Sequence, residues 1–231
     1  MTLLFLSRLK LNPRDRHVRR DLADCHDLHR TLLTAFPQAE GETARAQFGV
    51  LFRLDAGRDG SAVLLVQSKL EPDWARLPEG YLLERAACKT VADLYDGLQT
   101  GQRLIFRLRA NPTKRLPLLK ESRVGKERGK RVELQREEDQ LAWLRRKSTE
   151  HGFRLLSAHV NPDIANLRAS PEQKTFGRRA GERLTFGAVL FEGELEITDA
   201  TRFRQTLADG IGAGKAYGFG LLSIALVRAH S

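Results

Sequence analysis

The chain has 231 residues, which is more than one typical domain and too few for three, so its length predicts two compact domains. Apolar residues make up 41% of it, and 39 Lys and Arg against 29 Asp and Glu give a formal charge of +10. That excess favours a polyanionic partner, either nucleic acid or an anionic membrane surface. No apolar run approaches the length that spans a bilayer, and no clear basic amphipathic helix is present, so we expect no membrane partner.

The two cysteines predict a reduced, cytoplasmic setting. Cys25 and Cys88 are too few and too far apart for a disulfide framework or a zinc knuckle. The opening apolar run over residues 2–6 is too short for the core of a signal peptide and has no basic segment before it. We read this run as the beginning of a strand.

The first half of the chain predicts the order strand, helix, strand, strand. Residues 2–11 alternate as a strand. Apolar residues every three or four positions then predict a single helix over residues 17–36, with a buried stripe of Leu22, Cys25, Leu28, Leu32 and Phe36. Strands over 46–54 and 61–68 follow, joined by a segment rich in hairpin-turn residues.

The second half predicts the order strand, helix, strand, strand, helix, strand. After a short helix near residues 91–98, these elements fall at 102–109, 136–151, 153–160, 183–197, 199–209 and 220–228. The order is that of the ferredoxin-like fold, and the first half begins in the same way. We therefore predict an α+β protein of two tandem ferredoxin-like domains, residues 1–92 and 93–231.

A basic segment follows the strand at 102–109. Residues 107–131 carry ten Lys and Arg against two Glu, which leaves a net charge of +8 over 25 residues. Such a loop can follow phosphates or enter a groove of an RNA helix. Its attachment to the end of a strand favours this role over the alternative of a solvated insertion. The predicted RNA contacts here are Arg107, Arg109, Lys114, Arg115, Lys126, Lys130 and Arg131.

A glycine-rich segment spans residues 210–222. Closely spaced glycines let backbone amides approach an anion, and Lys215 adds a positive charge. The segment is not a P-loop, because Lys215 is followed by alanine and the loop runs from a helix into a strand. Two alternatives stay open: an RNA-phosphate nest made by Gly212, Gly214 and Lys215, and a purely structural glycine turn.

Two histidines, His26 and His29, lie about one helical turn apart, so both imidazoles project from one side of the predicted first helix. Imidazole has the side-chain pKa nearest neutrality, which suits it to move the proton of a ribose 2′-hydroxyl or of a leaving 5′-oxygen. A partly buried structural histidine is the common alternative. No carboxylate or thiol cluster lies near in sequence, so we expect no metal and no cofactor.

Six segments, taken together, carry a family resemblance. The two most specific are Arg-Leu-Arg-Ala-Asn-Pro-Thr-Lys at residues 107–114 and the glycine-rich segment, and the others lie at 23–30, 63–68, 142–144 and 189–193. In this order along nearly the whole chain, they resemble the CasE (Cse-type) family of CRISPR type I-E repeat endoribonucleases.

The resemblance implies a function and a site. It implies metal-free cleavage of the CRISPR repeat hairpin at the base of its stem, leaving a 2′,3′-cyclic phosphate and a 5′-hydroxyl. It also implies that the guide RNA stays bound within a type I-E surveillance complex, whose other subunits are expected partners. The family's active histidine falls on His29. The family often has tyrosine three residues earlier, where this chain has His26, which we include in the predicted catalytic pair.

Two other functions remain as alternatives. One is a non-catalytic RNA-hairpin-binding subunit of the same fold, in which the basic segment matters and His29 does not. The other is a nucleotide-hydrolysing switch that uses the glycine-rich segment, although that segment lacks a Walker motif.

Overall fold

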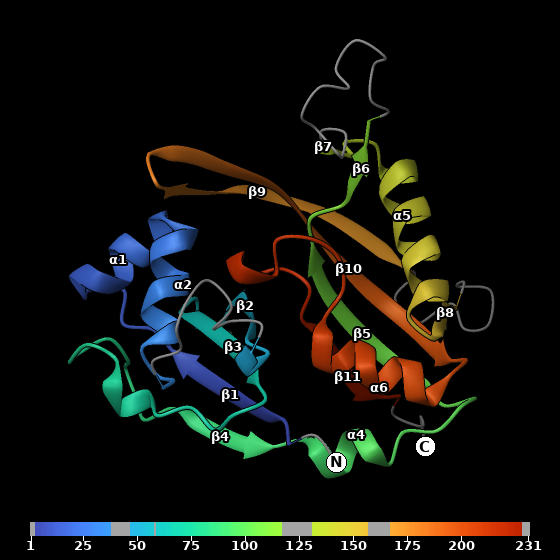
Figure 1. Cartoon of the computed structure of the whole chain (residues 1–231), viewed down its shortest axis with the longest axis horizontal. Helices are drawn as coiled ribbons and strands as arrows, with labels where there is room; N and C mark the ends of the chain where they lie inside the picture. The colour runs from blue at the N-terminus through green and yellow to red at the C-terminus, as the bar shows by residue number, and fades with distance from the viewer. Residues whose placement is uncertain (1–2, 38–46, 58, 117–130, 157–166, 228–231) are drawn as a thin grey trace.

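Two antiparallel sheets form the framework of the molecule (Figure 1). The computed structural model describes residues 3–37, 47–57, 59–116, 131–156 and 167–227. The first sheet is built from the N-terminal part of the chain and the second from the C-terminal part. A two-stranded ribbon stands apart from both.

The first sheet has the strand order β2-β3-β1-β4. Its strands are β1 (Phe5–Lys10), β2 (Leu51–Ala56), β3 (Ala62–Ser68) and β4 (Ala87–Thr90). Helices α1 (Arg16–Ala23) and α2 (Cys25–Leu33) connect β1 to β2. The 3-10 turn η1 (Trp74–Arg76) lies between β3 and β4, where a ferredoxin-like fold has its second helix, and α4 (Ala92–Asp96) follows β4.

The second sheet has the order β11-β5-β10-β8, with β9 also paired to β10. Its strands are β5 (Arg103–Ala110), β8 (Phe153–Leu155), β9 (Arg168–Arg179), β10 (Glu182–Ile197) and β11 (Leu222–Leu226). Helices α5 (Glu137–Glu150) and α6 (Ala200–Asp209) provide the two crossovers. The two sheets thus share the ferredoxin-like order, and the prediction of two tandem ferredoxin-like domains is confirmed.

Each sheet packs its own hydrophobic core. The first core contains Leu28 and Leu32 of α2 against Phe52 of β2. In the second, side chains of α5 and α6 such as Trp143 and Phe203 cover buried residues of β5 and β10. Leu4, Val91 and Tyr95 also belong to the second core, so the chain passes from one core to the other near residue 91. The division into residues 1–92 and 93–231 stays a prediction.

The sheets are joined by buried polar side chains. The Arg53 guanidinium from β2 donates to Ser223 Oγ of β11 over 2.9 Å and is paired with Asp55. Gln67 Nε2 of β3 donates to the Leu207 carbonyl of α6 over 2.6 Å. Both Arg53 and Gln67 are buried, so these bonds form in a desolvated setting and fix how the two sheets face one another.

The predicted single helix over residues 17–36 is wrong. The structure has two helices, because Asp24 adopts an extended conformation between α1 and α2 and its side chain caps the second. The apolar spacing continues across this break, which is why the periodicity did not reveal it. Leu22, expected in the buried stripe, is 38% exposed, whereas Cys25 and Leu28 are buried as predicted.

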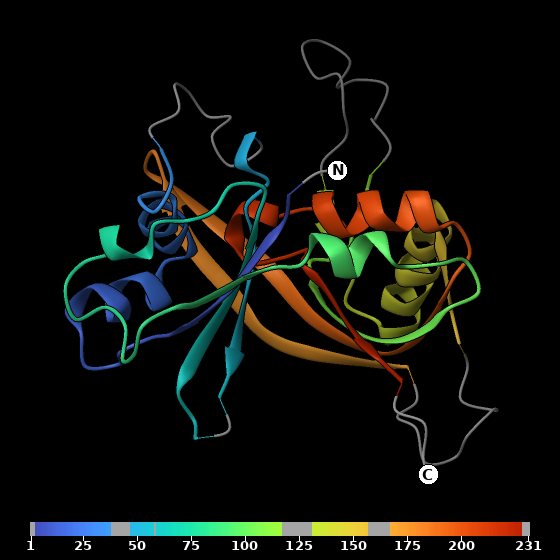
Figure 2. The same ribbon diagram turned by 90° about the horizontal axis from the view of Figure 1, so that it is seen from below.

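Strand β9 was not predicted. It is a mostly exposed strand that pairs with β10 alone, and it contains Pro171 and Gly177, so no apolar alternation marks it. Ala180 and Gly181, both with positive φ, form the two-residue turn into β10. The resulting hairpin extends from the second sheet to α1 and α2 (Figures 1 and 2).

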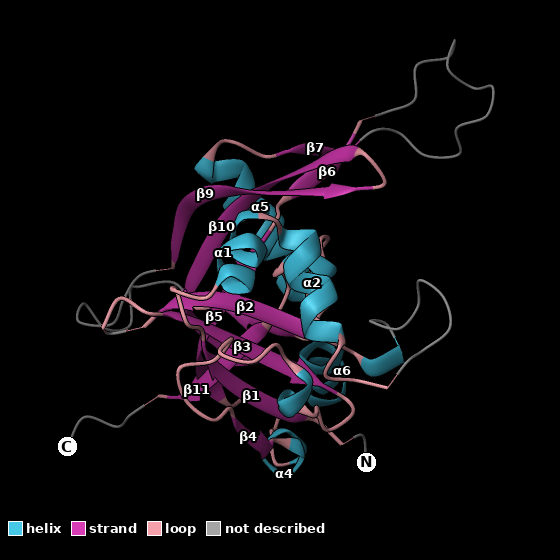
Figure 3. Cartoon of the chain, turned by 90° about the vertical axis from the view of Figure 1, so that its left-hand side faces the viewer, coloured by secondary structure: helices cyan, strands magenta, loops and turns pink. Residues whose placement is uncertain are grey.

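The basic segment begins in β5 and then enters a two-stranded ribbon, in which it also ends. Strands β6 (Thr113–Arg115) and β7 (Arg131–Glu133) pair there, and neither was predicted. The ribbon and the β9–β10 hairpin lie at the same end of the molecule (Figure 3), where Lys174 Nζ is 2.9 Å from Glu133 Oε2. Lys126 and Lys130 lie outside the described residues.

Several predicted strands have different bounds. The strand expected from residue 46 begins at Leu51, because Gln47 and Phe48 form a helical turn. Strand β8 ends at Leu155, and the remainder of the predicted strand to residue 160 lies largely outside the described residues. Within the described part of the chain, no helix is long and apolar enough to cross a membrane.

Candidate functional site

Helix α2 is held at its N-terminus by one carboxylate. Asp24 Oδ1 accepts hydrogen bonds from the amides of His26 and Asp27 over 2.8 and 3.3 Å, which caps the helix. Asp24 Oδ2 accepts from the Arg178 amide of β9 over 3.0 Å. Gly177 permits this approach, since a Cβ there would lie 2.8 Å from Cys25 Sγ. The helix that carries both histidines is therefore fixed to the β9–β10 hairpin of the other domain.

Two substitutions separate the functions of Asp24. Asp24→Asn keeps an oxygen that can cap α2 but replaces the other acceptor with a donor facing the Arg178 amide. Asp24→Ala removes both interactions, so we expect it to lower the free energy of unfolding by about 1 kcal/mol more than Asp24→Asn does, the usual contribution of an N-cap. Denaturant unfolding of the two variants measures this difference. Equal losses would mean that the cap contributes nothing.

His26 and His29 meet a tyrosine from the other domain. The Tyr217 ring centroid lies 6.3 Å from that of His26 and 6.2 Å from that of His29. Tyr217 also packs on Phe186 of β10 at 4.9 Å. Both imidazoles are partly buried. The site is thus composite: its histidines come from the first domain and its tyrosine from the second.

The neighbouring thiol, that of Cys25, is poorly suited to act as a nucleophile. Cys25 is buried beneath β9, and burial raises the pKa of its thiol to about 11, so it stays protonated and a weak nucleophile at neutral pH. Among the described residues, no group of three or more His, Cys, Asp or Glu side chains is placed to hold a metal ion. The titratable rings that meet here are the two imidazoles and the Tyr217 phenol.

The glycine-rich segment forms a tight loop between α6 and β11. Gly212 and Gly214 both have positive φ, at 85° and 79°, and a Cβ at either position would press on the ring of Trp143 or Phe219. Conformation and packing thus explain both glycines, which favours the structural alternative. Lys215 Nζ donates to the Asp209 carbonyl at the end of α6 over 2.6 Å. The anion-binding role of these three residues stays a prediction.

Arg109 of β5 contacts the glycine-rich loop. Its guanidinium donates to Glu172 over 2.6 Å and to Thr175 over 3.0 Å, and it lies 4.5 Å from the centre of the Phe219 ring. The Arg109 carbonyl accepts from the Gly220 amide. Because these contacts occupy most of the guanidinium, Arg109 is better placed to orient the loop than to bind phosphate, and its predicted RNA contact remains untested.

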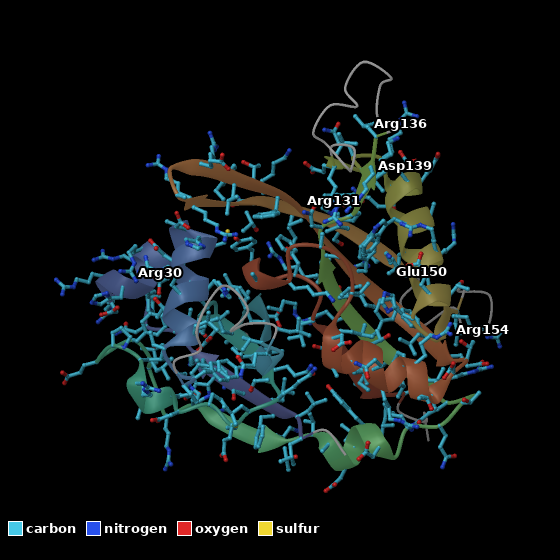
Figure 4. The ribbon with its side chains drawn as sticks, viewed as in Figure 1. Arg30, Arg131, Arg136, Asp139, Glu150 and Arg154 are labelled. Atoms are coloured by element: carbon cyan, nitrogen blue, oxygen red, sulfur yellow. The ribbon has the colours of Figure 1, made fainter. Side chains whose placement is uncertain are left out.

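A basic pocket of about 530 Å³ opens between the β6–β7 ribbon, α5 and the glycine-rich loop. It gathers four of the predicted RNA-binding side chains, together with Arg146 and Lys147 of α5 and His151 directly after it, none of which was predicted as a site residue. Among the described residues its cationic lining is Lys114, Arg115, Arg131, Arg146, Lys147 and Lys215, and that lining holds no carboxylate; Glu150, outside it, pairs with Arg146 and Lys147. Figure 4 labels Arg131 beside α5. Such a pocket suits a phosphate-rich ligand.

Arg107 lies apart from this pocket. Its guanidinium pairs with Glu192 of the neighbouring strand at 2.7 Å, and it lines two other depressions near Arg53 and Asp55. The glycine-rich loop instead links the two parts of the site, because Lys215 lines the basic pocket and Tyr217 contacts the histidines within one 3-10 turn, η4 (Lys215–Tyr217). The basic pocket and the imidazoles are therefore connected through this one 3-10 turn.

Known proteins are similar to this chain in sequence and in architecture. A family model described as CRISPR associated protein matches residues 4–225. The CRISPR-associated endoribonuclease Cse3 of Thermus thermophilus is 42% identical over 226 residues, which cover 96% of this chain and all of Cse3. The chain belongs to the CasE family of CRISPR-associated proteins. Another CasE-family protein, the CRISPR system Cascade subunit CasE of Escherichia coli, is 37% identical over 131 residues, 55% of this chain and 60% of that protein.

Solved structures of CasE-family proteins have the same fold. T. thermophilus Cse3 bound to an RNA representing a pre-cleavage complex superposes with a TM-score of 0.76 at 40% identity, covering 96% of this chain and 99% of Cse3. Cas6e of E. coli gives a TM-score of 0.65 at 27% identity, covering 96% of this chain and all of Cas6e. The family resemblance expected from the sequence is confirmed.

Proposed function

We propose that this CasE-family chain is a metal-independent endoribonuclease that cuts the hairpin of CRISPR repeat transcripts and retains the guide RNA. The observation that carries the proposal is that His26 and His29 both contact Tyr217. This tyrosine lies in the same 3-10 turn as Lys215, one of the six Lys and Arg residues that line the basic pocket. An RNA held by its phosphates in the pocket would present its backbone to two acid–base groups.

The chemistry follows from these groups. The ribose 2′-hydroxyl attacks the adjacent phosphorus in line with the leaving 5′-oxygen, so one P–O bond forms while another breaks and the products end in a 2′,3′-cyclic phosphate and a 5′-hydroxyl. His29 transfers a proton in this step, either from the nucleophile or to the leaving group. Lys and Arg side chains stabilise the negative charge of the phosphorane electrostatically.

The relatives support the partners that we propose. A CRISPR endoribonuclease Cse3 was solved with a bound 19-nucleotide RNA, and the E. coli relative is a Cascade subunit. By similarity, we propose that this chain binds a repeat hairpin and assembles with the other subunits of a type I-E surveillance complex. Its site of action would be the cytoplasm, where the transcripts are made.

The main alternative is a subunit that binds the hairpin without cutting it. Incubating the purified protein with repeat RNA from the organism's own array in the presence of EDTA distinguishes the two functions. We expect a single cut at the base of the stem and a product that remains bound. A shifted but intact RNA would identify a binding subunit, and cleavage that requires added Mg²⁺ would refute metal independence.

A further inference from the structure

A second cavity, of about 880 Å³, has Tyr217 in its wall and shares no lining residue with the basic pocket. It is enclosed by α1 and α2, by β2, by the β9 segment over residues 172–176 and by the end of the glycine-rich loop. Tyr217 belongs to its wall and also contacts both imidazoles. His26 and His29 do not themselves line the cavity, so a ligand in it would be connected to the histidines through Tyr217.

The charges in this cavity are already compensated. Asp21 pairs with Arg20 at 2.7 Å, Arg109 with Glu172 at 2.6 Å, and Lys174 with Glu133 at 2.9 Å. The basic pocket has six cationic residues and no carboxylate among its described lining residues; Glu150 pairs with Arg146 and Lys147, which leaves the other four with no carboxylate partner in that lining. A phosphate would thus bind in the basic pocket, and this cavity suits an uncharged group.

The walls of the cavity offer flat apolar surfaces. Phe176 of β9 is 41% exposed and is the one aromatic residue among the large hydrophobic side chains exposed in the described part of the chain. The Arg183 guanidinium lies 4.9 Å from the centre of its ring. Leu22, 38% exposed, and the buried Phe52 also line the cavity. Exposed aromatic rings beside an Arg are typical surfaces for stacking single-stranded bases.

We propose that this cavity holds the unpaired nucleobase that adjoins the scissile phosphate, stacked on Phe176. The inference rests on the proposed function, in which the cut separates the stem from an unpaired strand. With the stem in the basic pocket and the scissile phosphate at the histidines, the next nucleotide would reach the cavity whose wall includes Tyr217. Gln173 and Thr175 offer polar atoms at the wall, while stacking itself accepts any base.

The proposal is tested with RNA that binds but is not cut. A repeat hairpin with a 2′-deoxyribose at the cleavage position is prepared with the flanking nucleotide either intact or abasic. We expect Phe176→Ala to weaken binding of the intact RNA about tenfold, within the usual range for loss of one base–aromatic stack, and to leave binding of the abasic RNA unchanged. Phe176→Tyr keeps the ring and should bind both RNAs as the wild type does.

The matched control is Leu94→Ala on α4, which removes another exposed apolar side chain and should change neither Kd. Wild-type affinity of Phe176→Ala for the intact RNA, or an equal loss with both RNAs, would overturn the proposal. Cleavage of the ordinary repeat by the wild-type protein in EDTA reports separately on the proposed function, so a failure of one is distinguishable from a failure of the other.

Discussion

Replacing His29 by alanine is expected to lower the single-turnover rate of hairpin cleavage by at least about a hundredfold, the lower range for losing a proton-transfer group. The imidazole is partly buried against Tyr217, and its loss leaves the cationic lining of the basic pocket intact. Hairpin affinity should therefore stay near the wild-type value. The measurement is a cleavage time course at saturating protein, with the Kd of the hairpin measured in parallel.

Variants of His26 can be compared with His29→Ala within the same site. His26→Ala should slow cleavage less than His29→Ala, and His26→Tyr should remain active, because the family often has tyrosine at this position. A His29→Ala protein that binds and cleaves like the wild type would show that His29 is structural. A folded but inactive His26→Tyr protein would show that the chemistry depends on imidazole at both positions.

The second large effect is expected in the basic pocket. Substituting Lys114, Arg115 and Arg131 together by alanine should flatten the slope of log K against log salt by up to about three units, near one for each lost phosphate contact. At moderate salt this corresponds to an affinity loss of about a hundredfold. Cleavage at saturating protein should persist, because the histidines lie on α2, outside the substituted ribbon. Hairpin binding at several salt concentrations measures both quantities.

A matched control removes the same charge elsewhere. Arg14, Arg16 and Arg19 are exposed in and just before α1, and none of them lines the basic pocket. Their joint replacement by alanine should leave the salt slope nearly unchanged. Equal effects of the two triple variants would mean that net charge alone attracts the RNA and that the pocket is not its binding site.

The sequence predicted the fold well where periodicity and element order carry the information. The ferredoxin-like order of β5, α5, β8, β10, α6 and β11 follows from apolar alternation, helix signals and turns, and it is present in the structure. The same reasoning merged α1 and α2, because a helical period does not register one extended residue such as Asp24. It also missed β9, a polar strand paired on one side, whose conformation depends on β10 rather than on its own residues.

The candidate site was predictable only in part. The spacing of His26 and His29 placed both on one side of a helix, and local charge identified four side chains that meet in the basic pocket. Tyr217 could not be found in this way, because only the tertiary fold brings η4 against α2. Arg146, Lys147 and His151 were missed for a related reason, since their charges read simply as the basic end of a helix.

The central claim, that an RNA 2′-hydroxyl is the nucleophile at a site served by His29, is tested most directly by changing that hydroxyl. The wild-type protein is incubated in EDTA with two repeat hairpins, one all-ribose and one with a single 2′-deoxyribose immediately 5′ of the scissile phosphate. We predict equal binding of the two RNAs, cleavage of the all-ribose hairpin to a 2′,3′-cyclic phosphate, and no cleavage of the other. Cutting of the deoxy-substituted hairpin at a comparable rate would contradict the account, because water would then be the nucleophile.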